Sequence, residues 1–295
     1  MTTAGGRTAV LIAAAVLTAA AGLPGAGAAA RPWPAPPRPV TAGPVGPSST
    51  YNALTSVSAD SASDAWAVGS YVSNTTGVRD TLILHWNGTA WSRVASPNPG
   101  TRFNVLNGVS AGGAKNAWAV GFYRTQAPGA LPLILHWNGT AWSQVTAPAS
   151  GMPQTELNGV STVSGRSAWA AGFAGRPALG QFATLLLHWN GTSWTQVASP
   201  DPGKTDSFLQ GVSATASGGA WAVGSYQRGT TLRTLVLQWS GTSWAQVKSA
   251  SPASNVLNGV SADSATDAWA VGYYLSKGVR YALILHWNGT AWSVR

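Results

Sequence analysis

Trp118-Ala119-Val120-Gly121 is the stretch that decides the fold, because it or a close copy occurs five times, beginning also at Trp66, Trp169, Trp221 and Trp269. The copies are spaced by 52, 51, 52 and 48 residues. A fixed period of about 50 residues is typical of stacked supersecondary units, none of which buries its apolar surface alone. Two further tryptophans, five residues apart, follow each copy, at Trp86 and Trp91, Trp137 and Trp142, Trp189 and Trp194, Trp239 and Trp244, and Trp287 and Trp292. Of the 16 tryptophans, only Trp33 therefore lies outside the repeat.

The second repeat predicts four short strands, which we call a, b, c and d in chain order. They cover residues 105–111, 117–121, 133–137 and 141–145. Gly121 is expected to end strand b, and Asn138-Gly139 between strands c and d is the strongest short hairpin signal, because both turn positions need positive φ. The unit carries no helical periodicity. Each repeat is therefore predicted to form one four-stranded antiparallel sheet.

A two-residue turn at Asn138-Gly139 also predicts the register of the c–d hairpin. It places three pairs opposite each other: Trp137 with Thr140, His136 with Ala141, and Leu135 with Trp142. Because side chains alternate, both tryptophans then share one face with Leu135, and His136 lies on the other face. Both faces are bulky, which suits a sheet covered on both sides by radially arranged neighbours.

Strand a carries a small residue at its centre, which is Ser56, Gly108, Gly159, Gly211 or Gly259. Strands crowded together around an axis need small side chains. We therefore expect strand a to be the innermost strand of each sheet.

These residues resemble the kelch repeat of β-propellers, as in the central domain of galactose oxidase and in uncharacterised secreted bacterial proteins with tryptophan-rich repeats. Trp118-Ala119-Val120-Gly121 resembles the glycine-ended kelch strand, and residues 133–142 resemble the strand, tight turn and tryptophan that follow it. One glycine stands where kelch commonly has two, and the usual tyrosine before the turn is missing. The resemblance implies an all-β fold, a β-propeller of about five four-stranded antiparallel blades. The blades would cover residues 51–103, 104–155, 156–206, 207–254 and 255–295.

Five repeats fit a closed ring, an open arc, or part of a longer protein. The fifth repeat is short, since its strand d would cover only residues 291–295. Kelch-like propellers more often have six or seven blades. Of the three alternatives, we expect the closed ring.

Residues 1–30 are predicted to be a secretory signal peptide. Arg7 precedes an apolar run over residues 9–23, and small residues spaced for cleavage follow at 26–30. The run is short for a membrane span, although an uncleaved anchor is the alternative. Residues 31–50 hold seven prolines and predict an extended linker. We therefore expect a secreted protein, extracellular or associated with the cell envelope.

The composition restricts the chemistry and the partners. The chain has no cysteine, which excludes disulfides, thiol catalysis and thiolate metal sites. Its net charge of +9 favours anionic surfaces such as wall polymers or acidic polysaccharides, with membrane contact at most peripheral. Nucleic acid is not expected, because the protein is predicted to be exported and no basic helix is present.

No catalytic or metal-binding constellation is recognised, so we expect a protein that is not an enzyme and has no cofactor. The four histidines, His85, His136, His188 and His286, occupy one equivalent site per repeat, and Gln238 stands there in the fourth. Equivalent sites in separate blades do not converge on one ion. Asp64 and Asp267, with Asn116 and Ser167 at equivalent positions, are expected to cap turns. The alternative is an extracellular carbohydrate-active enzyme using Asp80, Asp201 or Asp206.

The connections between strands b and c are predicted to be the longest and most variable loops. Arginine beside tyrosine there suits an acidic or neutral polysaccharide, because the sugar ring stacks on the aromatic side chain and the guanidinium binds a carboxylate or phosphate. We expect a non-catalytic binding propeller for a glycan, cell-wall polymer or protein. The alternatives are a structural envelope component, or tyrosines that finish strands and arginines that keep loops soluble. The predicted binding residues are Tyr71, Arg79, Tyr123, Arg124, Arg176, Tyr226, Arg228, Arg233, Tyr274 and Arg280.

Overall fold

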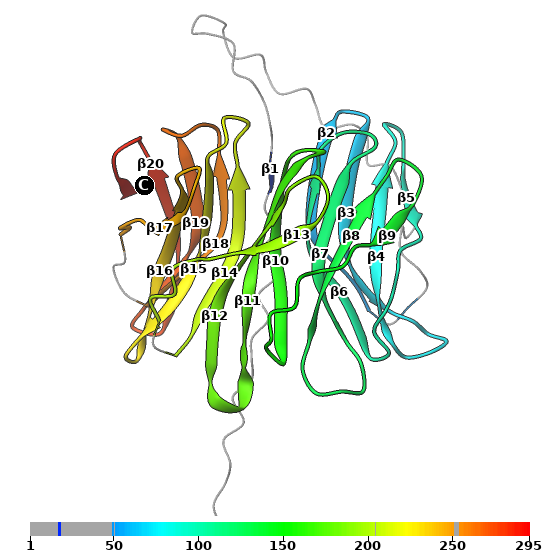
Figure 1. The fold of residues 1–295 in the computed structure, drawn as a ribbon, viewed down its shortest axis with the longest axis horizontal. Coiled ribbons are helices and arrows are strands. Elements are labelled where there is room, and N and C mark those ends of the chain that lie inside the picture. Colours follow the sequence, from blue (N-terminus) through cyan, green and yellow to red (C-terminus); the bar gives the residue numbers. More distant parts are fainter. Residues whose placement is uncertain (1–16, 19–48, 50, 204, 251–253) are drawn as a thin grey trace, which may run out of the picture.

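The computed structural model describes residues 17–18, 49, 51–203, 205–250 and 254–295. These residues form five four-stranded antiparallel units, here called blades one to five, which follow one another around an arc (Figure 1). A single parallel pair, Arg79 with Phe103, joins blades one and two into one sheet. Blade one contains β2 (Asn52–Ser61), β3 (Asp64–Val72), β4 (Arg79–Trp86) and β5 (Trp91–Val94), and blade two contains β6 (Phe103–Ala111), β7 (Ala117–Arg124), β8 (Leu131–Trp137) and β9 (Trp142–Gln144). Blade three contains β10 (Gln154–Ser164), β11 (Ser167–Arg176), β12 (Gln181–Trp189) and β13 (Trp194–Val197), and blade four contains β14 (Ser207–Ala214), β15 (Ala220–Arg228), β16 (Thr231–Trp239) and β17 (Trp244–Gln246). Blade five contains β18 (Ser254–Ala262), β19 (Ala268–Ser276), β20 (Val279–Trp287) and β21 (Trp292–Val294). The predicted all-β class and the four-stranded antiparallel blades are confirmed.

Two short elements lie outside this pattern. β1 (Leu17–Thr18) pairs in parallel with β2 at Val57 and Ser58, and a single 3-10 turn, η1 (Pro177–Leu179), connects β11 to β12. No helix among the described residues is long and apolar enough to cross a membrane. The predicted signal peptide and linker lie outside the described residues, apart from β1 and Ser49.

The first strand of each blade carries a β-bulge at the same place. In β6 the register against β7 shifts between Leu106 and Gly108, which leaves Asn107 without a partner in the ladder. The shift recurs in β2, β10, β14 and β18. A Cβ on Gly121 would collide with the Val105 carbonyl oxygen, so glycine permits this close approach. Gly121 therefore lies inside strand b, and the prediction that it ends the strand is wrong.

Strand a is innermost, as predicted, because inner strands of successive blades approach each other closely. A Cβ on Gly108 would lie 3.2 Å from the Cα of Gly159, and one on Gly159 would lie 3.1 Å from the Cα of Gly211. Larger side chains at these positions would push the blades apart.

The register predicted for the c–d hairpin is wrong by two residues. Trp137 lies opposite Trp142, and His136 lies opposite Ser143. The turn is longer than two residues, because the Asn138 side-chain oxygen accepts hydrogen bonds from the backbone N–H groups of Thr140 and Ala141, at 2.9 and 3.0 Å. This side-chain-to-backbone turn competes with the tighter one. An even shift leaves each side chain on its predicted face, so both tryptophans still share a face.

Tryptophans join each blade to the next. The indole of Trp66 in blade one contacts Trp137 and Trp142 of blade two, with ring centroids 4.8 and 5.1 Å apart. Trp118, Trp169 and Trp221 repeat this three-ring contact with the following blade, and the second contact is edge-on each time. Burying several large aromatic surfaces at every junction supplies most of the apolar area that one blade cannot bury alone.

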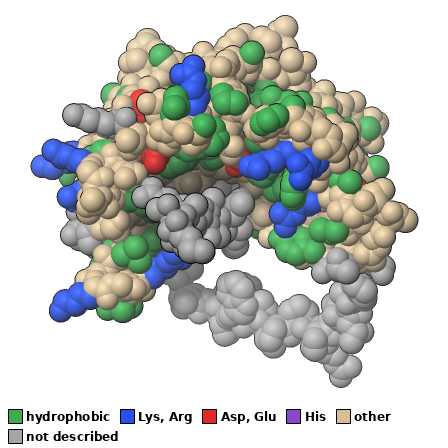
Figure 2. All heavy atoms as spheres, turned by 90° about the horizontal axis from the view of Figure 1, so that it is seen from below, with side chains coloured by type: hydrophobic (Ala, Val, Ile, Leu, Met, Phe, Trp, Pro, Cys, Tyr) green, Lys and Arg blue, Asp and Glu red, His purple; other side chains and the backbone are tan. Residues whose placement is uncertain are grey.

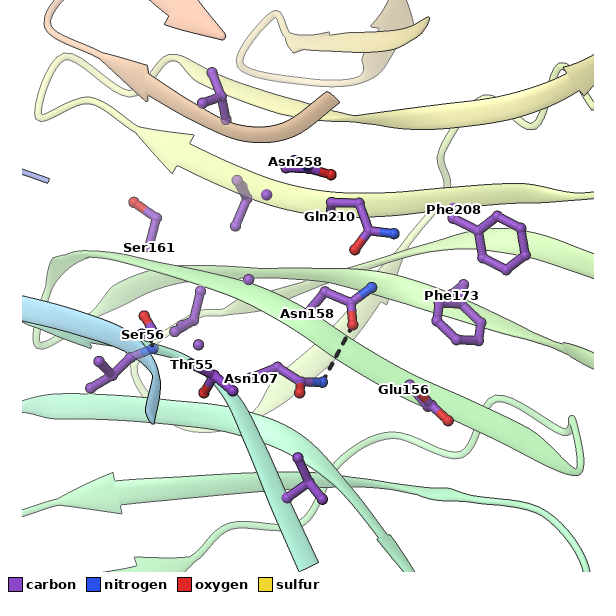
Figure 3. Close-up of a pocket in the computed structure, with 18 of the residues that line it drawn as sticks. Thr55, Ser56, Asn107, Glu156, Asn158, Ser161, Phe173, Phe208, Gln210 and Asn258 are labelled. Carbon is purple, nitrogen blue, oxygen red and sulfur yellow. Dashed lines mark hydrogen bonds between the residues drawn. The ribbon is translucent and has the colours of Figure 1, made fainter. Parts of the chain in front are cut away.

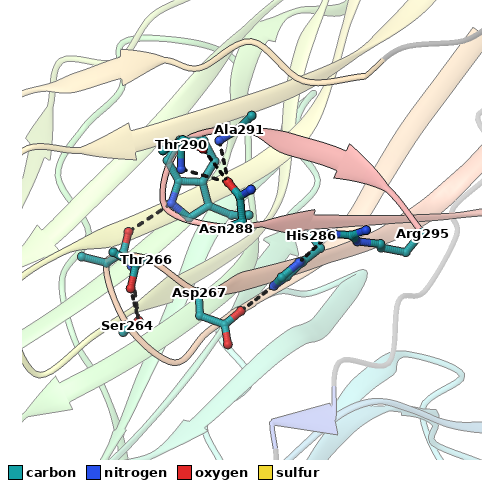
Figure 4. A network of polar contacts seen from close by, with 10 residues as sticks. Ser264, Thr266, Asp267, His286, Asn288, Thr290, Ala291 and Arg295 are labelled. Atoms are coloured by element: carbon teal, nitrogen blue, oxygen red, sulfur yellow. Dashed lines mark hydrogen bonds and ion pairs between the residues drawn. The ribbon is translucent and has the colours of Figure 1, made fainter.

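The histidines are structural. The His136 ring packs on that of Trp118, tilted by 33° with centroids 4.3 Å apart, and its Nε2 lies 2.9 Å from the Asn116 side-chain oxygen. Asp64, Ser167 and Asp267 hold the other histidines in the same way, as the Asp267–His286 contact in Figure 4 shows. Blade four has Gln238 in place of histidine and Gly219 in place of the polar partner. We expected these polar residues to cap turns, but their main contact is with the histidine ring, which they orient.

The ring does not close through the described residues. Successive inner strands pack together from β2 to β18, but β18 and β2 do not pack on each other. The indole of Trp269 in blade five is 44% exposed, whereas the equivalent Trp118 is 1% exposed. The expected closed ring is therefore not observed, and the described chain forms an open arc.

Truncating an equivalent indole should have unequal effects along the arc. Trp118→Ala should lower the free energy of unfolding by about 3–5 kcal/mol, because it removes a buried ring and leaves a cavity. Trp269→Ala should cost about 1 kcal/mol or less, since much of that ring is already hydrated. Urea unfolding of the two variants measures the difference, and equal losses would contradict the arc.

The half-buried histidines should make stability depend on pH. Burial lowers the pKa of His136 and of His188 from the usual 6.5. The unfolded chain therefore binds protons more readily than the folded chain, and stability should fall as the pH drops through about 6.5. The double variant His136→Gln, His188→Gln, which copies Gln238, should weaken this dependence. Melting temperatures measured between pH 8 and pH 5 test it, and curves of unchanged slope would refute it.

Candidate functional site

The bulged residues of the inner strands surround a cavity of about 520 Å³ along the axis of the arc. A bulge turns the extra residue out of the regular alternation of its strand. The five bulged side chains lie at one level of the cavity wall, and Figure 3 shows them on successive strands. They are Thr55, Asn107, Asn158, Gln210 and Asn258. We call this set the polar ring.

Two amides of the polar ring also connect neighbouring blades. The Asn107 Nδ2 donates to the Leu157 carbonyl oxygen at 2.9 Å, and the Asn158 Nδ2 donates to the Leu209 carbonyl oxygen at 2.8 Å. The Asn107 Nδ2 also lies within hydrogen-bond distance of the Asn158 Oδ1, at 3.4 Å, as Figure 3 shows. Each amide oxygen has two lone pairs, so both side chains still have acceptor capacity for a ligand. The side chains of Gln210 and Asn258 make no hydrogen bond to another described residue. The cavity wall therefore offers both donors and acceptors.

Aromatic side chains line the end of the cavity near the b–c connections. Phe173 and Phe208 contact each other edge-on, with ring centroids 4.9 Å apart. Tyr51 and Tyr273 line the same cavity, and each lies under a guanidinium group. Arg79 lies 4.3 Å from the Tyr51 ring centroid, and Arg280 lies 4.0 Å from that of Tyr273. This end, which we call the aromatic mouth, presents flat apolar surfaces beside positive charge.

Glu156 brings a carboxyl group to the cavity lining. It is buried, accepts a hydrogen bond from Gln154 at 2.8 Å, and lies 3.4 Å from the Arg124 guanidinium. Burial raises the pKa of Glu156 above its usual 4.5, and the charge of Arg124 opposes that rise. Desolvation is the larger effect, so the ionised form is disfavoured at this position.

The predicted tyrosines face away from the cavity. Tyr123, Tyr226 and Tyr274 lie at the ends of strands b and pack against the apolar cores between blades. Tyr71 packs in the small apolar cluster of blade one that contains Leu82, Leu84 and Trp91. Alternation along the strand turns the preceding residue, such as Phe173 or Tyr273, toward the cavity instead. These tyrosines were expected at the start of loops, and the structure places them in strands.

The predicted arginines divide into three groups. Arg79 lines the cavity. Arg124 and Arg280 lie beside it, because Arg124 contacts the lining residue Glu156 and Arg280 contacts the lining residue Tyr273. Arg233 lines a separate hollow of about 330 Å³ with Tyr226. Arg176 and Arg228 are exposed at the ends of β11 and β15. Figure 2 shows the molecule from the end where β11 connects to β12, and lysine and arginine side chains are spread over that face. Their role in binding stays a prediction.

The carboxylates considered for catalysis do not gather in the cavity. Asp80 lies in β4, where burial raises its pKa while the Asn104 amide, 3.4 Å away, and Arg93 lower it. Asp201 and Asp206 lie between β13 and β14. No group of three potential metal ligands occurs among the described residues.

Sequence reasoning missed the polar ring, although a signal for it is present. Leu-Asn-Gly occurs at 106–108, 157–159 and 257–259, and Leu-Gln-Gly at 209–211. A glycine inside a strand pattern indicates a bulge, and the polar residue before it is the one that the bulge turns inward.

No protein-family model and no curated protein sequence matches the chain. Solved structures match its fold. A lectin of Aleuria aurantia, described as a six-bladed β-propeller with a novel fucose recognition mode, is 14% identical with a TM-score of 0.50, over 81% of this chain and 77% of the lectin. The fold is a β-propeller. A polysaccharide lyase acting on ulvan is 9% identical with a TM-score of 0.52, over 81% of this chain and 68% of the lyase.

Glu156 should destabilise the propeller as the pH rises. Because folding raises the pKa of Glu156, the folded state binds a proton at this carboxyl more tightly than the unfolded chain does. The stability that results is fully present below pH 4.5 and is lost as the pH rises through the raised pKa. Glu156→Gln should therefore raise the melting temperature at pH 7 but not at pH 4. Arg124→Gln should lower it at pH 7, because Arg124 favours the ionised form. A Glu156→Gln variant less stable than the parent at pH 7 would contradict this.

Proposed function

We propose that the propeller binds a carbohydrate in the cavity, between the aromatic mouth and the polar ring. The observation that carries the proposal is the convergence of amide and aromatic side chains from all five blades on one cavity. Sugars present an apolar C–H face that stacks on aromatic rings and hydroxyl groups that hydrogen-bond to amides. The volume of about 520 Å³ suits a small ligand.

The charge near the mouth favours an acidic sugar over a neutral one. Arg79 and Arg280 each lie over an aromatic ring of the cavity, and a guanidinium binds a carboxylate or sulfate through two parallel hydrogen bonds. A lectin described as recognising fucose and a lyase bound to a uronic-acid polysaccharide share this fold, which supports a carbohydrate as the kind of partner. A cell-wall polymer with acidic sugars is within this class.

We propose binding without catalysis. Hydrolysis of a glycosidic bond commonly needs two carboxyl groups about 5–10 Å apart. Glu156 lines the cavity, but Asp80, Asp201 and Asp206 are not among its lining residues. The hydrogen bond from Gln154 and the ion pair with Arg124 suit a structural carboxyl group.

We further propose that the repeats are a divergent kelch type and that the chain is exported. The tryptophan that opens each strand d and the invariant glycine of strand b support the first proposal. The apolar segment after Arg7 and the absence of cysteine are compatible with export and with stability from burial alone. Detection of the mature chain outside the cell, beginning near residue 31, would test export.

Titration calorimetry against neutral and uronic-acid oligosaccharides tests the binding proposal. Gln210→Ala removes a free amide of the polar ring and should weaken binding about fivefold to tenfold, the value of one hydrogen bond. Gln196→Ala, at an exposed position of β13, is the matched control and should bind as the parent does. No heat from any saccharide, or equal loss in both variants, would refute the proposal.

A further inference from the structure

Glu156 departs from the repeat at a position that faces the cavity. It precedes the leucine that all five inner strands share, and the other blades carry Ala53, Val105, Phe208 and Val256 at this place. Val105, Phe208 and Val256 line the cavity together with Glu156. An apolar side chain is therefore compatible with the scaffold here, and a blade forms without a carboxyl group at this position.

The two polar partners of Glu156 form a cluster with it at the junction of blades two and three. The Gln154 amide donates to the Glu156 Oε1 at 2.8 Å, and the Arg124 guanidinium lies 3.4 Å from the same oxygen. The positions equivalent to Arg124 in the other blades hold Val72, Gly175, Gln227 and Leu275. Burying a carboxyl group costs free energy that an apolar residue avoids, so this cluster is a candidate for a role in binding.

Arg124 has hydrogen-bonding capacity that Glu156 does not use. Only one terminal nitrogen of the guanidinium contacts Glu156, and the buried Nε makes no hydrogen bond to another described residue. The Arg124 side chain is 40% exposed, whereas that of Glu156 is 9% exposed. A guanidinium has five N–H donors and binds a carboxylate or sulfate through two parallel hydrogen bonds. An anionic group that enters the cavity beside Glu156 therefore competes with it for Arg124.

We propose that Glu156 is an internal anion that an acidic ligand displaces from Arg124, and that Glu156 takes up a proton as the ligand binds. This inference rests on the proposed binding of a carbohydrate, and it assigns the place of the ligand's anionic group. In the exchange, the ion pair between Arg124 and Glu156 breaks, and Arg124 pairs with a carboxylate or sulfate of the ligand. One proton moves from solvent to the Glu156 carboxylate, so the charge within the cavity is the same before and after binding.

The environment of Glu156 supports the uptake of a proton. Burial raises the pKa of Glu156, and the charge of Arg124 opposes the rise. A ligand that pairs with Arg124 removes this opposition and raises the pKa further. By linkage, an acidic ligand should bind more tightly as the pH falls, by at most about tenfold per pH unit for one proton. A neutral ligand leaves the ion pair intact, so its binding should not follow the titration of Glu156.

Few other titratable groups lie near Glu156. The strands that pack most extensively on β10 are β6, β7, β8, β11 and β14, and β6 and β14 carry no titratable side chain. Beside Arg124, the other three strands carry Tyr123, which packs in the core between blades, His136, which lies near the far end of β8, and Arg176, which is exposed. The other ionisable side chains among the described lining residues are Tyr51, Arg79 and Tyr273. Glu156 is therefore the only carboxyl group among the described residues of the cavity wall, and no imidazole lines it.

Glu156 is the only glutamate in the chain, so its titration can be observed alone. Carbon-13 NMR of the full chain labelled at glutamate Cδ follows the carboxyl group between about pH 3 and pH 8. The probes are sodium sulfate against sodium chloride at equal ionic strength, and a galacturonic acid trisaccharide against a galactose trisaccharide. The variants are Arg124→Gln and, as the matched control, Arg166→Gln in the exposed turn between β10 and β11.

The proposal expects sulfate and the acidic trisaccharide to raise the midpoint of the Glu156 titration in the parent and in Arg166→Gln, but not in Arg124→Gln. The galactose trisaccharide should leave the midpoint unchanged. In calorimetry, Glu156→Gln should bind the acidic trisaccharide at pH 7 as tightly as the parent does at pH 5.

Two results would overturn the exchange: a midpoint that neither sulfate nor the acidic trisaccharide moves, or a shift that persists in Arg124→Gln. Saccharide binding with an unchanged midpoint refutes the exchange alone. A sulfate effect that depends on Arg124, with no binding of any saccharide, supports the exchange and refutes the carbohydrate proposal.

Discussion

Packing of one indole against two indoles of the next blade is the interaction on which the rest of the structure depends. A blade of four short strands has two apolar faces and almost no interior of its own. Trp66, Trp118, Trp169 and Trp221 each bring a large ring to a junction. In the indole pairs that receive these rings in blades two, three and five, the strand-c indole N–H donates to the preceding a–b turn, as Trp137 does to Ala114 at 3.1 Å. Stability is therefore a property of junctions more than of blades.

The same construction produces the cavity. Glycine in strand b allows the carbonyl group of strand a to approach, and the bulge that follows turns one polar residue per blade toward the axis. Packing thus requires a bulge, and the bulge supplies the polar ring. The scaffold fixes where these amides lie, while the aromatic mouth varies from blade to blade, with Phe173 and Tyr273 where blades one and four have Ser70 and Ser225. This division between constant ring and variable mouth is suited to recognition on a rigid frame.

The sequence was sufficient to predict the repeat, the strands and the innermost position of strand a, because hydrophobic periodicity and small residues report these directly. It failed where two local preferences compete. Asn138-Gly139 favours a two-residue turn, but the Asn138 side chain stabilises a longer one. The predicted tyrosines lie one residue from the aromatic positions that face the cavity, and strand alternation makes that difference decisive. Whether the ring closes depends on junction geometry that no single repeat encodes.

Burial of the strand-b indoles runs in one direction along the arc and ends at blade five, where Trp269 is 44% exposed. Fluorine NMR of the chain labelled with 5-fluorotryptophan, with a soluble paramagnetic agent added, measures it most directly. We predict strong broadening of the Trp269 resonance and little broadening of Trp66, Trp118, Trp169 and Trp221. Equal protection of all five, or equal broadening of all five, would contradict it.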